Sequence, residues 1–225
     1  MGMGGRFFAA TYDRFMRSTE QAGLAGYRAN LLAEASGDVL EIGGGTGANL
    51  PYYGPSVASL ALVEPAPAML KRLDRKARAT APTAKVLRAP AEDLPYDDAT
   101  FDTVVSTLVL CSVPDQPRAV AELRRVLRPG GRLLFLEHVR SDDPKLARMQ
   151  DRMNVINRLV VHCDCNRPTL DTLRAGGFEI TAVDHSSLPK SPPFVRPMVV
   201  GTAVAAAATA TRGAMQQSDS SAPTV

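Results

Sequence analysis

The sequence has no hydrophobic run long enough to cross a bilayer. Its longest weakly apolar stretch, residues 198–208, is short and rich in alanine, whereas a membrane-spanning helix needs about 20 mostly apolar residues. The first residues, Met1–Arg6, match neither a secretory signal nor a myristoylation signal. We therefore expect no transmembrane segment and a cytoplasmic protein with reduced cysteines.

A strong net charge is also absent, since 26 basic side chains against 23 acidic ones leave +3. Basic residues gather in one segment, residues 71–78, but Asp74 interrupts them and no aromatic residue lies among them. We interpret this segment as a solvated helix face and expect no nucleic-acid partner. The oligomeric state stays open.

Cysteine is scarce, and its three residues form no familiar metal motif. Cys163 and Cys165 stand beside His162 and Asp164. These donors are too close along the chain for one tetrahedral ion, and the sequence shows no second cluster to complete a site. We therefore expect no metal. Cys111 follows a buried segment, and we interpret it as an apolar wall residue rather than a nucleophile.

What the sequence does contain is a buried strand that runs into a glycine loop. Gly43, Gly45 and Gly47 allow a sharp turn and a close approach to a ligand. Glu41, just before them, would repel a pyrophosphate and attract a cationic amino-acid group. This favours S-adenosylmethionine. Because Gly43, Gly45 and Ala48 also fit the dinucleotide pattern, a nicotinamide-dependent oxidoreductase stays open as an alternative.

A second buried strand, residues 60–63, ends in Glu64, 21 residues after Gly43. At about this distance a carboxylate accepts hydrogen bonds from a ribose diol. Pro65 follows directly. Met69, in the next helix, is a candidate for contact with an adenine, with plain core packing as the alternative.

Strands and helices alternate along the rest of the chain. A helix opens at Pro117 and stops at residues 129–131. Alternation predicts a parallel sheet with helices on both faces and a ligand at the carboxyl ends of the strands. Further strands are expected at residues 101–107, 132–137, 178–185 and 196–204.

These motifs together resemble the class I S-adenosylmethionine-dependent methyltransferases, in the group that includes the ubiquinone and menaquinone methyltransferases. The resemblance covers about residues 38–140. It is carried by the E-x-G-x-G-x-G loop, the acid that ends the second strand, A-E-D-L-P, F-D-T-V-V and L-R-P-G-G. A narrower resemblance, to the membrane-associated alkyl-thiol methyltransferases, is carried by the segments that begin at Thr107, Phe135, Asp164 and Val195.

The resemblance implies an α/β, Rossmann-like class I methyltransferase fold. Its sheet would be mostly parallel and seven-stranded, with helices on both faces and an antiparallel last strand. The methyltransferase domain would span residues 37–205. The cofactor would be S-adenosyl-L-methionine, bound by Glu41, Gly43, Gly45, Gly47, Glu64, Pro65, Met69, Ala91, Glu92 and Thr107.

Two features depart from the pattern. Many relatives hold the adenine amino group with an aspartate where this chain has Pro90. That leaves Glu92, Asp93 or backbone groups near Ala91 for the role, and the thiol-methylating relatives also lack the aspartate. Those relatives begin with a hydrophobic membrane anchor, whereas this sequence begins with Met1–Arg6.

The two ends of the sequence differ in character. Residues 1–36 form an N-terminal helical segment in which Phe7, Phe8, Tyr12 and Phe15 recur at helical intervals. It is either a lid over the cofactor or a helix packed permanently on the sheet. The tail, residues 206–225, is expected to be disordered because it offers no apolar anchor.

Methyl transfer from a sulfonium needs little acid or base chemistry when the acceptor is a good nucleophile, and a thiol is partly ionised near pH 7. We therefore expect a methyltransferase acting on a small apolar acceptor, best a thiol. A C- or N-methyltransferase for a quinol or lipid amine is the alternative, and a non-catalytic cofactor-binding module is another. His138 is the catalytic candidate, with a structural role as the alternative. Candidate acceptor-side residues are Tyr12, Cys111, Asn166 and Arg167.

Overall fold

The structure is a computed structural model that describes residues 3–161 and 163–206, with side chains described for residues 11–158 and 163–206. The side chains of Phe7 and Phe8, the residue His162 and the tail from residue 207 lie outside these ranges. The helices are α1 (Met3–Thr19), α2 (Ala25–Leu32), α3 (Pro67–Thr80), α4 (Gln116–Val126), α5 (Pro144–Val161) and α6 (Thr169–Ala175). A π-helical turn, Glu20–Leu24, joins α1 to α2, and short 3-10 turns lie at Leu50–Tyr52 and Pro193–Val195.

Seven strands form one sheet. They are β1 (Gly37–Ile42), β2 (Val57–Val63), β3 (Lys85–Leu87), β4 (Phe101–Thr107), β5 (Leu127–His138), β6 (Phe178–Ser187) and β7 (Pro197–Ala205). Their order is β3-β2-β1-β4-β5-β7-β6, and only β7 runs antiparallel to its neighbours. The predicted fold class is confirmed. The strand order reverses between β1 and β4, and ligands of open α/β sheets bind at such a point.

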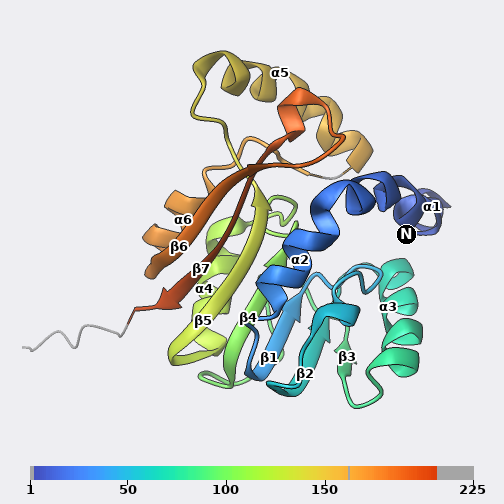
Figure 1. Ribbon diagram of the computed structural model, residues 1–225, viewed down its shortest axis with the longest axis vertical. Coiled ribbons are helices and arrows are strands. Elements are labelled where there is room, and N and C mark those ends of the chain that lie inside the picture. Colours follow the sequence, from blue (N-terminus) through green and yellow to red (C-terminus); the bar gives the residue numbers. More distant parts are fainter. Residues whose placement is uncertain (1–2, 162, 207–225) are drawn as a thin grey trace, which may run out of the picture.

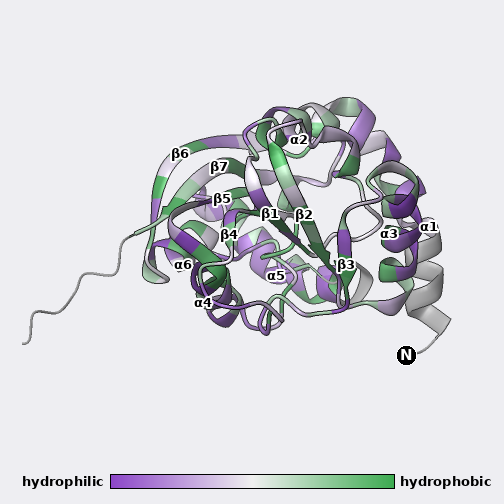
Figure 2. Cartoon of the chain, turned by 90° about the horizontal axis from the view of Figure 1, so that it is seen from below, coloured by the Kyte–Doolittle hydropathy of each residue, from purple (hydrophilic) through white to green (hydrophobic). Residues whose placement is uncertain are grey.

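Successive side chains of each strand point to opposite faces of the sheet, so each strand contacts both layers of helices. Val39 of β1 faces α2, together with Val105 and Leu134. Leu40 faces the opposite layer, where α4 and α6 pack. Figure 2 shows the hydrophobic residues of β1 and β2 in the middle of the molecule and hydrophilic positions on the outer helices. Because both faces are covered, the parallel strands read as nearly continuous apolar runs.

Two helices lie beyond the carboxyl ends of the parallel strands rather than on a face of the sheet. Figure 1 shows α5 at the top of the molecule and α1 beside it, above the ends of β1 to β3. The site predicted at these strand ends is therefore bordered by α1 on one side and by the segment around α5 on the other.

The sequence did not predict three details of this fold. The edge strand β3 was missed because it is only three residues long and exposes Lys85 and Leu87. The helix α5 was not predicted either. The helix expected to stop at residues 129–131 ends earlier, at Val126, and β5 begins immediately at Leu127, so that Pro129 and both glycines lie inside the strand, next to a register shift.

Candidate functional site

The glycine loop follows β1 and has the left-handed backbone that its sequence predicts. Gly43, Gly45 and Gly47 have φ values of 56°, 57° and 81°, which disfavour any residue with a Cβ. A Cβ on Gly43 would strike Val109, and one on Gly47 would strike Leu50. Gly45 is different, since its nearest neighbour would be a carbonyl oxygen 3.8 Å away. Of these three glycines, Gly45 is therefore the one that borders open space.

The Glu41 side chain is buried at the end of β1 and already has two donors. Asn49 donates to Oε1 at 3.0 Å and the Tyr53 hydroxyl donates to Oε2 at 2.7 Å. Burial raises the pKa of Glu41 to about 7, although Tyr53, Arg28 and Asn49 each favour its ionised form. Each carboxylate oxygen has a second lone pair, so Glu41 can still accept from a ligand.

Arg28 of α2 is a functional candidate that the sequence analysis missed. Its guanidinium is buried, with 4% of the residue exposed, and donates to Asn49 at 2.8 Å and to Thr107 at 2.9 Å. Glu20 accepts from Nε at 3.1 Å. Asn49 also donates to Thr107. A buried cation thus stands beside Glu41 with Asn49 between them. Nothing in the local sequence marks Arg28, which is one of many arginines on the predicted helices.

Thr107, predicted to contact the cofactor, ends β4 and belongs to this network. Its hydroxyl oxygen lies 2.9 Å from both the Arg28 and the Asn49 donors. The network therefore joins α2, the glycine loop and the carboxyl end of β4. It leaves a cationic and an anionic side chain together at one end of the sheet.

Glu64 ends β2 beside the glycine loop. Its Oε2 accepts from the Gly45 N–H at 3.0 Å and its Oε1 accepts from the Ala66 N–H at 2.8 Å. Burial raises the pKa of this carboxyl, and the two backbone donors oppose the shift. Glu64 thus lies next to the glycine that borders open space. A contact with a ribose stays a prediction.

The remaining cofactor candidates follow the ends of β2 and β3. Pro65 is exposed and Met69 is buried in α3, with 8% of the residue accessible. Ala91 is buried, and Glu92 accepts from the Asp115 N–H at 3.2 Å. The structure gathers these residues on the side of the sheet that the glycine loop also occupies. Contact of Met69, Ala91 or Glu92 with an adenine stays a prediction.

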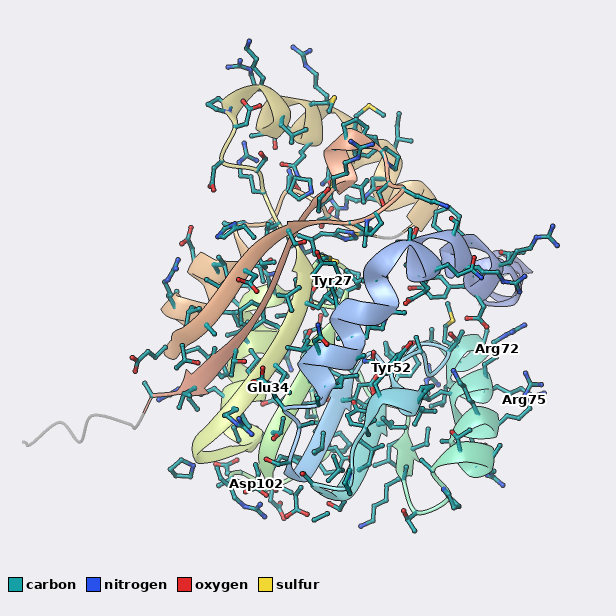
Figure 3. All side chains as sticks on the ribbon, viewed as in Figure 1. Tyr27, Glu34, Tyr52, Arg72, Arg75 and Asp102 are labelled. Atoms are coloured by element: carbon teal, nitrogen blue, oxygen red, sulfur yellow. The ribbon has the colours of Figure 1, made fainter. Side chains whose placement is uncertain are left out.

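Helix α1 is docked onto the glycine loop through Asp13. The Thr46 hydroxyl donates to Asp13 at 2.6 Å, and Arg72 of α3 lies 3.9 Å from the same carboxylate. Figure 3 shows Arg72 at the end of α3 that faces α1. Lys76, in the same basic segment, donates to the Gly47 carbonyl at 2.6 Å. Part of the basic segment therefore holds the loop and α1, while motion of α1 as a lid stays a prediction.

Tyr12, an acceptor-side candidate, lies one residue before Asp13 on the docked helix. Burial raises the pKa of Tyr12 to about 12; nearby Arg28 lowers it, whereas Glu20, Cys111 and Cys163 raise it further. Tyr12 is therefore close to the Arg28 network and also to the two cysteines. This brings it to the boundary between the predicted cofactor side and the predicted acceptor side.

The loop after β4 is held by a buried carboxylate at the end of β5. Leu108 has a positive φ of 59°, which is rare for a residue with a branched side chain and reverses the chain direction after Thr107. Glu137, which is fully buried, accepts from the Ser106 hydroxyl at 2.6 Å. It also accepts from the N–H groups of Val109, Leu110 and Cys111. These bonds fix the position of the Cys111 side chain.

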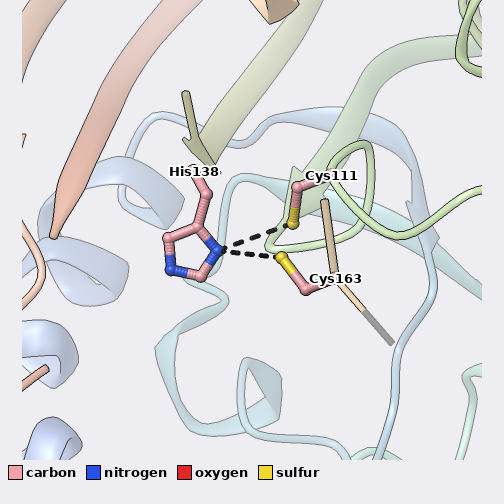
Figure 4. Close-up of side chains that lie close together, drawn as sticks. All are labelled: Cys111, His138 and Cys163. Carbon is pink, nitrogen blue, oxygen red and sulfur yellow. Dashed lines mark hydrogen bonds between the residues drawn. The ribbon is translucent and has the colours of Figure 1, made fainter. Parts of the chain in front are cut away.

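Cys111, His138 and Cys163 converge beyond the ends of β4 and β5. The His138 Nδ1 atom lies 3.6 Å from the Cys111 sulfur and 3.4 Å from the Cys163 sulfur (Figure 4). All three residues are buried. Contact with the Cys163 thiol and burial raise the pKa of Cys111 well above its ordinary value. The sequence shows no second cluster to complete a site with Cys163, but the fold brings two distant donors, Cys111 and His138, to it.

Asn166 and Arg167, predicted on the acceptor side or as loop anchors, anchor the segment after α5. Arg167 donates to Asp164 at 2.6 Å and to the Leu110 carbonyl at 3.1 Å. Asn166 donates to Asp151 of α5 at 2.9 Å. The Asp164 N–H donates to the Cys111 carbonyl at 2.8 Å. These bonds hold residues 163–167 against the Cys111 loop, and direct contact of either residue with an acceptor stays a prediction.

The fold and this site define a class of protein. A doubly wound sheet, a left-handed glycine loop at its switch point and carboxylates at the ends of β1 and β2 are the features of a nucleoside-binding α/β enzyme. Arg28 and Glu41, joined through Asn49, add a cationic and an anionic side chain at the same end of the sheet.

Comparison with known proteins identifies the family. A model of the methyltransferase domain matches residues 40–135. The human thiol S-methyltransferase TMT1A is 32% identical over 171 residues, which cover 74% of this chain and 70% of that protein. The phosphatidylethanolamine N-methyltransferase of Cereibacter sphaeroides is 35% identical, over 51% of this chain and 57% of its own length. A crystal structure of a methyltransferase from Thermotoga maritima has the same fold, with a TM-score of 0.67, 24% identity and coverage of 89% and 97%.

The chain therefore belongs to the class I S-adenosylmethionine-dependent methyltransferases, and S-adenosylmethionine is its cofactor. The nicotinamide-dependent alternative is not supported. Within residues 3–161 and 163–206, no helix combines the length and the apolar character that a bilayer crossing requires.

Proposed function

We propose that this methyltransferase transfers the methyl group to a small, apolar thiol. The observation that supports the proposal most is the similarity to thiol S-methyltransferases, which reaches 42% identity over 113 residues for human TMT1B. That match covers only 46% of TMT1B, so its acceptor is a proposal for this chain. The site adds a buried thiol-lined wall, Cys111 and Cys163, at the acceptor side.

The residues of the site fit the cofactor. Gly45 borders the open space that a nucleoside would occupy, and Glu64 beside it has free lone pairs for a ribose diol. Glu41 would accept from the ammonium group of the methionine moiety. Arg28 would donate to its carboxylate, as guanidinium groups commonly do. When bound, S-adenosylmethionine supplies an electrophilic methyl group on a sulfonium.

The protein's own task is then to position the acceptor and to exclude water. A thiol needs only to lose its proton to become a strong nucleophile. An oxygen acceptor would need a strong base, and two histidines are described at this end of the sheet, the exposed His185 of β6 and the buried His138. The Nδ1 atom of His138 faces two thiols, whereas its buried Nε2 atom has no hydrogen-bond partner among the described residues.

The direct test is a screen of acceptors with methyl-labelled cofactor. Small aliphatic and aromatic thiols, reduced quinones and amine-bearing lipids should be compared at equal concentration, with mass detection of the product. We expect methylated thiols to form at least tenfold faster than any other product. Turnover of quinols or lipid amines with none of thiols would contradict the proposal.

Methylation of a lipid amine is the alternative that a specific observation favours. The Cereibacter sphaeroides phosphatidylethanolamine N-methyltransferase is 35% identical over 116 residues, close to the identity of the thiol enzymes. Its match spans about half of each chain, however, whereas TMT1A matches 74% of this chain. The match to TMT1A is also longer, 171 residues against 116.

Cofactor binding should depend on pH through Glu41. Because burial raises the pKa of Glu41 to about 7, this carboxyl is largely neutral at pH 6 in the free protein. A cationic ammonium lowers that pKa, so binding strengthens as the pH rises. We expect the dissociation constant of S-adenosylmethionine to fall about eightfold between pH 6 and 7.5. Titration calorimetry measures this directly.

The control is Glu41→Gln, which cannot titrate and should bind more weakly with no such trend. The raised pKa also links Glu41 to folding stability. In the free protein, protonated Glu41 stabilises the folded state at pH values below the ordinary carboxyl pKa. This contribution to the free energy of unfolding is lost as the pH rises through about 7. A wild-type dissociation constant that stays flat over this range would contradict the assignment of Glu41 to the ammonium group.

A further inference from the structure

Three buried side chains from distant parts of the chain point at one small volume among the candidate acceptor-side residues. Cys111 lies in the loop after β4, His138 ends β5 and Cys163 follows α5. Their donor atoms all lie within 4.8 Å of one another. Figure 4 shows both sulfur atoms directed at the same ring nitrogen. We propose that these three residues form a zinc site whose fourth position takes the acceptor thiolate.

The distances fit a tetrahedral ion. Zinc binds sulfur at about 2.3 Å and imidazole nitrogen at about 2.0–2.1 Å, which sets sulfur and nitrogen about 3.5 Å apart across a tetrahedral edge. The observed separations from Nδ1 are 3.6 Å to Cys111 and 3.4 Å to Cys163. Two thiolates and one imidazole are also donors that zinc selects.

Hydrogen bonding alone accounts poorly for the cluster. A neutral imidazole nitrogen has one lone pair and accepts well from one thiol, yet two thiols lie within contact distance of His138 Nδ1. A thiol is also a weak donor. A metal ion placed among the three atoms would bind that lone pair and both sulfur atoms at once.

The local structure holds the three ligands firmly. Glu137 binds three successive backbone N–H groups of the Cys111 loop. The Asp164 N–H donates to the Cys111 carbonyl at 2.8 Å, which ties the residue after Cys163 to the same loop. Asn157 of α5 donates to the Cys163 carbonyl at 2.6 Å. Ligands fixed by surrounding bonds are what a metal site requires.

The cluster lies next to the cofactor end of the sheet. Thr107, in the Arg28 network, pairs with Leu136, and His138 is two residues further along β5. Strand spacing and rise place these two backbone positions roughly 8 Å apart. Among the side chains that the structure describes, those of residues 11–158 and 163–206, no fourth histidine, cysteine or carboxylate joins the group. A site with three protein ligands leaves one position for an external ligand.

The zinc site would assign a further role within the proposed function. That its external ligand is a thiol rests on the proposed function. An acceptor thiol that binds zinc loses its proton to solvent and remains a thiolate near pH 7. A bond then forms between its sulfur and the methyl carbon, while the bond from that carbon to the sulfonium sulfur breaks. The products are a neutral thioether, which is a weak zinc ligand, and neutral S-adenosylhomocysteine.

The first measurement is the metal content of the full chain purified under reducing conditions with zinc present. We expect about one zinc per chain in the wild type and less than a tenth of that in Cys111→Ser and in Cys163→Ser. The matched control is Cys165→Ser, because Cys165 is equally buried but its sulfur contacts Asn154 instead. It should keep its zinc. Binding of S-adenosylhomocysteine by each variant reports whether it is folded.

The second measurement uses the cobalt-substituted protein, whose thiolate-to-metal absorption reports each sulfur ligand. Addition of hexanethiol should increase this absorption in the wild type without any methyl transfer. The inference is overturned if the folded wild-type protein holds no zinc, or if Cys111 and Cys163 form a disulfide in place of a metal site. It is also overturned if the cobalt spectrum does not change when a thiol that the enzyme methylates is added.

The two measurements distinguish failure of the zinc site from failure of the proposed function. A protein that binds zinc through Cys111 and Cys163 but methylates only amines or quinols would overturn the thiol acceptor and, with it, the role of the fourth position. A protein that methylates thiols equally well with and without zinc would overturn the zinc site's role alone.

Discussion

Gly45→Val should weaken binding of S-adenosylmethionine by more than about 100-fold while the protein remains folded. A Cβ on Gly45 would meet no protein atom closer than a carbonyl oxygen at 3.8 Å, and it would point into the space assigned to the ligand. A branched side chain fills that space in every rotamer. Titration calorimetry with S-adenosylmethionine is the measurement.

Backbone strain must be separated from exclusion of the ligand, since Gly45 has a positive φ that costs a residue with a Cβ roughly 1–2 kcal/mol. Gly130→Val is the matched control. Gly130 has a φ of 77° and also has open space around its Cβ position, but it lies near the start of β5, away from the site. Both variants should lose similar thermal stability. Equal affinity of Gly45→Val and Gly130→Val for the cofactor would refute the placement of the ligand at Gly45.

The sequence predicted the cofactor side of the site better than the acceptor side, for a physical reason. Gly43, Gly45 and Glu41 are neighbours along the chain, so their spacing in the sequence is enough to predict the shape of the loop. Glu64 ends the strand next to β1, and parallel strands bring their carboxyl ends to one edge. Local patterns of this kind need no knowledge of how distant segments pack.

Arg28 and the metal cluster could not be predicted in the same way. Arg28 reaches the site because α2 packs on the face of the sheet that Val39 and Leu134 form. Cys111 and His138 meet because β4 and β5 pair in parallel, and Cys163 joins them only when the chain returns from α5. The signal that could have raised the question was the scarcity of histidine and cysteine, with two of these six residues, Cys111 and His138, placed after separate predicted strands.

The fold shows the same division. Strands with continuous apolar runs, such as residues 60–63 of β2 and 133–136 of β5, were predicted because burial on both faces selects those residues. The edge strand β3 has only one partner and keeps charged and exposed residues, so its sequence carries no such pattern. The early start of β5 at Leu127 was not predicted because Pro129 and Gly130 usually mark a turn.

Glu64→Gln should weaken binding of S-adenosylhomocysteine by about 10- to 150-fold, because hydrogen bonds to a charged group contribute about 1.5–3 kcal/mol. In the free protein Glu64 accepts from the N–H groups of Gly45 and Ala66. The amide of glutamine keeps one oxygen for these donors, so it disturbs the loop less than alanine would. The NH2 group of glutamine cannot accept from the other backbone N–H, so the loop loses one hydrogen bond while the ligand loses a charged acceptor.

A ribose contact and a loop-holding role predict different results with a second ligand, the 2′,3′-dideoxy analogue of S-adenosylhomocysteine. If Glu64 binds the ribose diol, the wild type should bind the analogue at least tenfold more weakly than the parent compound. Glu64→Gln should then discriminate between the two ligands less than threefold. The exposed Glu179, near the start of β6, supplies the control, since Glu179→Gln should leave both affinities unchanged. Equal discrimination by wild type and Glu64→Gln would leave Glu64 as a support for the glycine loop and remove the ribose assignment.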